Sequence, residues 1–170
     1  DAGLARQRHF PAINWLNSYS LYPQSLDQWF RDNISQDFPE VRTQISGLLQ
    51  IEAELQEIVQ LVGSDALPVD QQLTLEVARM IREYFLQQNG FHEVDAYCDI
   101  NLQYKMAKAI LTFQDNAKKA MAAGGLLEDI VNVPSRTTLM RSRFEKGYLD
   151  RIDGLVDEMN KEIAAAVENN

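Results

Sequence analysis

The chain has 170 residues, 45% of them hydrophobic and 24% charged, and a formal net charge of −9 at pH 7. This length predicts one domain or slightly more, with a core that buries roughly 70% of the unfolded surface. The negative charge argues against a nucleic-acid partner, because phosphate contacts need clustered lysine and arginine. No apolar run approaches the roughly 20 residues that span a bilayer, and no signal-peptide pattern is present. Cys98 is the only cysteine, which excludes an intrachain disulfide and fits a reducing compartment.

The acidic residues are concentrated in the middle of the chain. Residues 24–100 contain 14 acidic and 4 basic side chains, whereas residues 101–170 contain 10 of each. A solvated acidic face is the ordinary explanation of such a distribution, and a binding surface for a basic partner is the alternative. Both interpretations stay open on composition alone.

The first segment, residues 1–23, has no regular period. Its run "RHFPAINWLNSYSLY" places large aromatic side chains where chain termini are usually polar: Phe10, Trp15, Tyr19 and Tyr22. We therefore expect a short irregular linker at an internal boundary of a longer protein, followed by a helical domain over residues 24–170. A short helix is predicted around residues 26–31.

A long antiparallel helical hairpin is predicted next. Apolar residues recur every three or four positions over residues 41–62, which indicates a helix of about six turns. Gly63 is expected to end this helix as its C-cap. In the connector "GSDALPVD", Pro68 cannot continue the first helix, and Asp70 is a suitable N-cap for the second.

The apolar period then continues to the end of the chain. It predicts the second helix of the hairpin over residues 71–89, closed at "QNG", where Gly90 can adopt a positive φ. A third helix follows from about Asn101 to the glycines at 124–125. After the short helical piece "LLEDIVNV", one last helix is expected from a Ser135 cap, with Phe144 among its inward residues and a frayed "ENN" end. The predicted fold class is an all-α helical bundle, and no strand pattern is seen.

Residue chemistry indicates no catalytic residue and no metal site in this chain. There is no GxxxxGK[ST] phosphate loop and no GxGxxG. The two histidines, His9 and His92, belong to no HExxH motif, and no catalytic triad is evident. The run "HEVDAYC" supplies too few evident ligands for a closed metal site. A metal-dependent bundle enzyme is therefore disfavoured, and the residues by themselves predict a scaffold or interaction module.

Three stretches carry a resemblance to a known family. The run "LARQRHFPAINWLNSYSLY" closely resembles the segment of the catalytic A subunit of V-type and A-type rotary ATPases that links its nucleotide-binding domain to its C-terminal helical domain. The run "LLQIEAELQEIVQLVGSDALPVDQQLTLEVARMIREYFLQQNGF" resembles the next part of that subunit, and "VNVPSRTTLMRSRFEKGYLDRIDGL" continues the match more loosely. The pattern F-P-A-I-N-W-L-x-S-Y-S favours the catalytic subunit over its non-catalytic B paralogue.

The resemblance implies a nucleotide site. In this family two phenylalanines at the positions of Phe10 and Phe91 help to enclose the adenine ring of bound ATP or ADP. Gln87, Gln88 and Gly90 are expected to shape the rim of that site. Mg²⁺ would be held by the nucleotide-binding domain, so the chain alone, without a phosphate loop, is expected to be inactive as an ATPase.

The resemblance also implies contact with a rotating central stalk through the loop between the two long helices. The expected contact residues are Gly63, Ser64, Asp65, Ala66, Leu67, Pro68, Val69 and Asp70. The matching loop of the related F-type catalytic subunit is D-E-L-S-E-E-D, whereas only two carboxylates are kept here. This difference favours a steric push by a stiff helical hairpin over a charge-driven contact.

The function implied by the resemblance is the coupling of ATP hydrolysis or synthesis to rotation for ion transport. The expected partners are the B subunits, the central-stalk subunits and the subunit's own nucleotide-binding domain, in a cytoplasmic head peripheral to the membrane. The alternative is a free-standing acidic helical interaction module that binds a basic partner.

Overall fold

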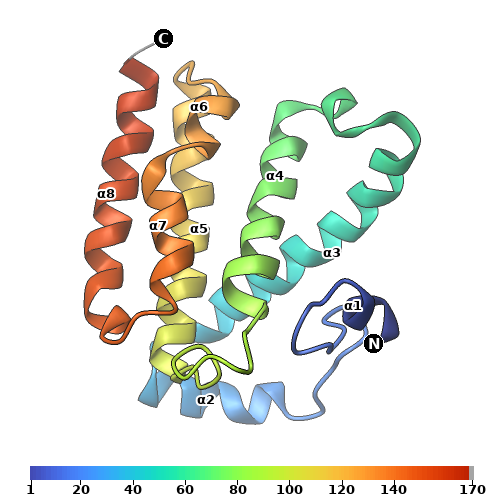
Figure 1. Cartoon of the computed structure of the whole chain (residues 1–170), viewed down its shortest axis with the longest axis vertical. Helices are drawn as coiled ribbons and strands as arrows, with labels where there is room; N and C mark the ends of the chain where they lie inside the picture. The colour runs from blue at the N-terminus through green and yellow to red at the C-terminus, as the bar shows by residue number, and fades with distance from the viewer. Residues whose placement is uncertain (169–170) are drawn as a thin grey trace.

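The computed structural model describes residues 1–168, and over this range the chain is all-α with a long antiparallel hairpin, which confirms the predicted fold class (Figure 1). In chain order the elements are α1 (Ala2–Arg6), α2 (Pro23–Asn33), α3 (Phe38–Val62), the 3₁₀ turn η1 (Ser64–Ala66), α4 (Val69–Met80), the π-helical segment η2 (Ile81–Leu86), α5 (Ile100–Ala122), α6 (Leu127–Val131), α7 (Pro134–Ser142) and α8 (Tyr148–Glu168). The expected fraying of the final "ENN" concerns Asn169 and Asn170, which lie outside the described residues; Glu168 is still helical.

The hairpin of α3 and α4 forms as the apolar period predicts. Gly63 ends α3 with φ of 83°, a conformation that glycine adopts without steric cost. The N-cap position of α4 is occupied by Pro68, so the prediction that Asp70 caps this helix is wrong. Asp70 lies in the first turn instead, where its negative charge favours the helix dipole.

The second arm of the hairpin ends earlier than predicted. Regular helix stops at Leu86, and Gln87 is already extended. The expectation that Gly90 uses a positive φ is also wrong, since positive φ occurs at Gly63, Gly124 and Gly147 among the glycines of residues 1–168. The stop follows from η2, whose wider turn leaves the α-helical pitch before the "QNG" signal is reached.

The core lies around α5, which packs against α3, α4 and α8. Ile110, Phe113 and Ala117 on α5 are completely buried, as the period of this helix predicts. Asp99 caps α5 by accepting a hydrogen bond from the Asn101 N–H at 2.8 Å. Figure 1 shows α8 running along α5 and α7, both of which it contacts, with α3 leaning away from these helices toward the tip of the hairpin.

The single last helix predicted from Ser135 is wrong. The chain leaves helical geometry after Ser142 and resumes it at Tyr148, with Gly147 at φ of 74° in the break. This break lets α8 fold back along α7 and α5. Val133 occupies the cap position of α7, while the Ser135 hydroxyl donates to Glu162 Oε2 at 2.5 Å.

The described helices and acidic side chains carry neither a membrane span nor a metal cluster. Within residues 1–168 no helix combines the length and the hydropathy needed to cross a membrane. In the same range no three side chains of the histidine, cysteine, aspartate or glutamate type gather closely enough to hold a metal ion.

Candidate functional site

A pocket of about 680 Å³ lies where the N-terminal segment, the loop after η2 and the break between α7 and α8 meet. All five residues predicted for a nucleotide site line it: Phe10, Gln87, Gln88, Gly90 and Phe91. They come from two segments almost 80 residues apart in the chain. The structure therefore brings the predicted residues together in one cavity.

Phe10 is held in place by its backbone and its neighbour. The Gln88 N–H donates to the Phe10 carbonyl oxygen at 2.6 Å. The Nε2 atom of His9 lies 3.2 Å from the Arg82 carbonyl oxygen, and its ring packs against Trp15 with centroids 5.3 Å apart. These contacts fasten the N-terminal segment to the end of η2, so the position of the Phe10 ring depends on that segment.

The two phenylalanine rings face solvent instead of the core. Phe10 is 54% exposed, and Phe91 is completely exposed. Exposed aromatic side chains that share a cavity are typical of binding sites, because burying them against water-excluding partners is favourable. The pair is thus free to contact a flat apolar ligand.

Gly90 lies directly against the Phe10 ring. A Cβ atom built on Gly90 would be 3.0 Å from Phe10 Cε1 and 3.2 Å from Cζ. Glycine permits this close approach without a shift of the Phe10 ring, whereas the sequence indicated a positive φ as its role.

This contact gives a testable prediction. Gly90→Val adds a branched Cβ and is expected to push the Phe10 ring out of its position, which should weaken ligand binding in the pocket. Gly47→Val is a matched control, because a Cβ at Gly47 has no atom within 4 Å. Equal ligand affinity of the two variants, measured by titration calorimetry on the complete subunit, would contradict the prediction.

The π-helical segment links the pocket to the hairpin. The Gln87 N–H donates to the Arg82 carbonyl oxygen at 2.9 Å, five residues back. The Arg82 guanidinium forks onto Glu52 of α3, with Nε 3.0 and 3.1 Å from the two carboxylate oxygens. Glu52 is 6% exposed. This partly buried ion pair ties α3 to η2, which leads into the pocket, and π-helical turns are frequent at functional sites.

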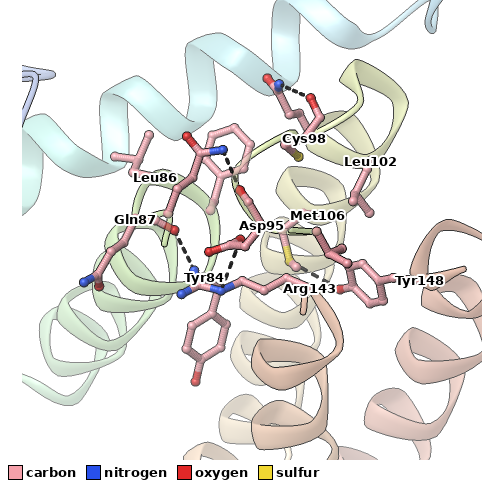
Figure 2. Close-up of a pocket in the computed structure, with 13 residues that line it drawn as sticks. Tyr84, Leu86, Gln87, Asp95, Cys98, Leu102, Met106, Arg143 and Tyr148 are labelled. Carbon is pink, nitrogen blue, oxygen red and sulfur yellow. Dashed lines mark hydrogen bonds and ion pairs between the residues drawn. The ribbon is translucent and has the colours of Figure 1, made fainter. Parts of the chain in front are cut away.

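A smaller cavity of about 200 Å³, drawn in Figure 2, shares Gln87, Gln88 and Arg143 with the pocket. The Cys98 thiol and the Tyr148 hydroxyl line it, and burial raises the pKa of Cys98 to about 11 and that of Tyr148 to about 12. Both groups are therefore neutral at physiological pH. Asp95 and Arg143, which also line this cavity, carry its charges, and sequence analysis did not assign either of them to a site.

The predicted stalk-contact loop lies at the tip of the hairpin, at the opposite end of the molecule from the loop after η2 (Figure 1). Its residues are exposed except Leu67, which is 6% exposed and packs inside the hairpin. Asp65 and Asp70 are its only carboxylates.

Three apolar side chains dominate the exposed surface of the tip: Leu61 at 85%, Val62 at 58% and Val69 at 50%. Ile58 and Val62 continue the apolar stripe predicted for residues 41–62, but they are 45% and 58% exposed, because α3 diverges from the bundle toward the tip (Figure 1). Leu61 was missed as a tip residue, although its place outside the apolar stripe signals exposure. The tip is thus more apolar than the loop sequence alone indicates.

These features define a class of protein: an all-α domain with an aromatic pocket at one end and a projecting apolar hairpin at the other. The chain belongs to the family described as the C-terminal domain of V and A type ATP synthase, which matches residues 27–131. The resemblance seen in the sequence is therefore confirmed.

Individual relatives agree with this assignment. The chain is 50% identical over 165 residues to the A subunit of the A-type ATP synthase from Methanosarcina barkeri, a match that covers 97% of this chain and 28% of that protein. It is 49% identical over 170 residues to the V-type ATP synthase alpha chain 1 of Clostridium tetani, covering 99% of this chain and again 28% of the relative. The chain thus spans little more than a quarter of the length of these relatives.

Proposed function

We propose that the chain is the C-terminal helical domain of the catalytic subunit of a V/A-type rotary ATP synthase. In this role it completes the adenine side of the nucleotide site and couples ATP hydrolysis or synthesis to rotation of the central stalk for ion transport. The observation that carries the proposal is the pocket in which Phe10 and Phe91 present exposed rings beside Gly90.

The proposal divides the chain into a linker, residues 1–23, and a helical domain, residues 24–170. Residues 1–23 join a nucleotide-binding domain that supplies the phosphate loop and holds Mg²⁺ with ATP or ADP. The chain alone is inactive in this proposal, and its partners are that domain, the B subunits and the central stalk, in a cytoplasmic head peripheral to the membrane. The relatives are named as ATP synthase subunits, which favours this proposal over a free-standing acidic module that binds a basic partner.

Stacking is the chemistry that the pocket offers. An aromatic face stacks on any purine, and each such contact contributes roughly 1–3 kcal/mol in nucleic-acid binders. Phe10 and Phe91 come from two segments that are hydrogen-bonded to each other through Gln88. A ligand bound between the two rings would therefore hold the linker and the loop after η2 in one relative position.

The route from the pocket to the tip is one continuous helical rod. Val69–Met80 and Ile81–Leu86 follow each other without interruption, and 18 residues span roughly 27 Å at about 1.5 Å per residue. The Arg82–Glu52 pair at one end fixes this rod to α3. A shift of the loop after η2 on nucleotide binding would move the rod as a lever and the tip with it.

Substitution of Phe91 tests the proposal. Phe91→Ala in the full-length subunit, assembled in its complex, is expected to weaken ATP binding by about 5- to 150-fold, the equivalent of roughly 1–3 kcal/mol. Tyr97→Ala is the matched control, since Tyr97 is also an exposed aromatic, at 86%, and follows in the same loop. An unchanged dissociation constant for Phe91→Ala, measured by nucleotide titration, would refute the adenine role.

A further inference from the structure

The break between α7 and α8 reaches the same pocket. Arg143 and Phe144 line it together with Phe10 and Phe91. They lie more than 50 residues beyond Phe91 in the sequence, and sequence analysis placed Phe144 in the core. Phe144 is only half-buried, and within residues 1–168 the core cluster does not include it.

Arg143 binds the end of η2. Its Nη1 donates to the Gln87 carbonyl oxygen at 2.7 Å and also to the Glu83 carbonyl oxygen. Carbonyl groups at the end of a helix lack intrahelical partners, and a cation is favourable there. The Arg143 side chain is 13% exposed, so these contacts are shielded from water.

Arg143 also holds the loop through Asp95, as Figure 2 shows. Its Nε lies 3.7 Å from Asp95 Oδ1, and Asp95 is 7% exposed. The other carboxylate oxygen of Asp95, Oδ2, accepts a hydrogen bond from the Asn89 N–H at 2.5 Å. The backbone carbonyl oxygen of Asp95 accepts one from Gln88 Nε2 at 3.0 Å. One arginine therefore contacts both ends of the loop that carries Phe91.

Phe144 is supported on two sides. The Arg143 guanidinium carbon lies 4.7 Å from the centroid of the Phe144 ring, a cation–π distance. The His92 ring meets it edge-on with centroids 5.1 Å apart. These neighbours leave the ring fixed at the wall of the pocket.

We propose that the break between α7 and α8 supplies a third wall of the base pocket. Phe144 contacts the purine directly, and Arg143 is a positioning residue that sets the Phe91 loop through Gln87 and Asp95. The inference rests on the proposed function, because it takes the ligand of this pocket to be a purine nucleotide.

Photolabelling of the full-length subunit in its complex separates the two claims. With 2-azido-ATP, we expect covalent label on the peptides that contain Phe10 or Phe91 and also on the peptide that contains Phe144. Label on the first two peptides without the third would overturn the third wall and leave the adenine site standing. Label on none of the three would overturn both.

Two variants test the separate roles. Phe144→Leu keeps an apolar side chain without an aromatic face, and it is expected to raise KM for ATP by about 5-fold, the lower end of a stacking contact, with kcat retained. Arg143→Lys keeps the charge but loses the planar guanidinium, whose Nη1 reaches two carbonyl oxygens while its Nε lies beside Asp95. It is expected to raise KM several-fold at equal kcat and to lower photolabelling of the Phe91 peptide relative to the Phe10 peptide.

Arg141→Lys is the matched control for Arg143, because Arg141 is an exposed arginine in the last turn of α7, two residues before Arg143. It is expected to leave KM and the labelling ratio unchanged. A KM for Phe144→Leu equal to that of the unsubstituted complex would overturn the contact with the base. An unchanged labelling ratio in Arg143→Lys would overturn the positioning role.

Discussion

Replacing Leu61, Val62 and Val69 together with serine in the assembled complex is expected to uncouple ATP hydrolysis from rotation. These side chains are the large apolar surface at the hairpin tip, and burying one of them fully against a partner stabilises a contact by roughly 1.5–3 kcal/mol. In the proposed function, their loss removes the apolar surface through which the tip pushes the stalk. Single-molecule rotation should show reduced torque, while nucleotide binding and hydrolysis continue because the pocket lies at the other end of the domain.

The matched control for this variant is Ile51→Ser, an exposed apolar residue on α3 at 46% that lies well before the tip. Leu67 is unsuitable for the test, because it is buried and its replacement would disturb the hairpin itself. Torque in the triple variant equal to that of Ile51→Ser would show that the apolar tip does not transmit the push.

Arg136→Ala is expected to lower the free energy of unfolding of the chain by about 3–5 kcal/mol, because it leaves a partly buried carboxylate without its main partner. Arg136 is 4% exposed, and its Nη2 lies 2.6 Å from Glu76 Oε2. Its Nη1 donates to the Val131 carbonyl oxygen at 2.6 Å, and its guanidinium lies 5.6 Å from the Phe113 ring centroid. The side chain thus joins α7 to α4, α5 and α6. For a domain of this size the loss corresponds to a fall in Tm of about 6–20 °C in a thermal melt.

Arg79→Ala is the control, since Arg79 contacts the same carboxylate from an exposed position and such pairs contribute about 0–1 kcal/mol. The pKa of Glu76 offers a second check. Partial burial opposes ionisation, but hydrogen bonds from Arg136 and Arg79 hold the pKa below its usual value. The stabilisation is therefore present above the usual glutamate range and fades as the pH falls through the lowered pKa. Equal unfolding energies for Arg136→Ala and Arg79→Ala at pH 7 would contradict the assignment.

The helices that could be predicted from the sequence are those whose apolar period matches their burial. For α4, α5 and the part of α3 up to Leu55 the apolar stripe lies against the core, and α3 and α5 end at the predicted signals Gly63 and Gly124. The apolar period did not predict that the last helix is divided into α7 and α8, because inward residues keep the same spacing on both sides of the break at 143–147. Spacing records which face is apolar, but it does not record where the chain turns back.

The residues of the pocket were harder to predict from the sequence than the helices were. Phe10 and Phe91 were assigned through resemblance, because nothing in the local pattern distinguishes them from core aromatics. Phe144 was taken for a core residue for the same reason, and Arg143 carries no sequence signal at all. Their roles depend on tertiary contacts between three segments, which a period of 3.6 cannot describe.

The π-helical turn has a consequence for tolerance to insertion and deletion. Its bond from Gln87 to Arg82 encloses one residue more than an α-helical turn. Each residue advances an α-helix by about 100° around its axis. Loss of a single residue from Ile81–Leu86 would turn this wide turn into a regular α-helical one and leave the residues beyond it, including Phe91, facing nearly as before. Loss of a residue from the regular helix Val69–Met80 would turn them by about 100° instead. The π-helical segment is therefore the place in this arm where the loss of one residue is best absorbed.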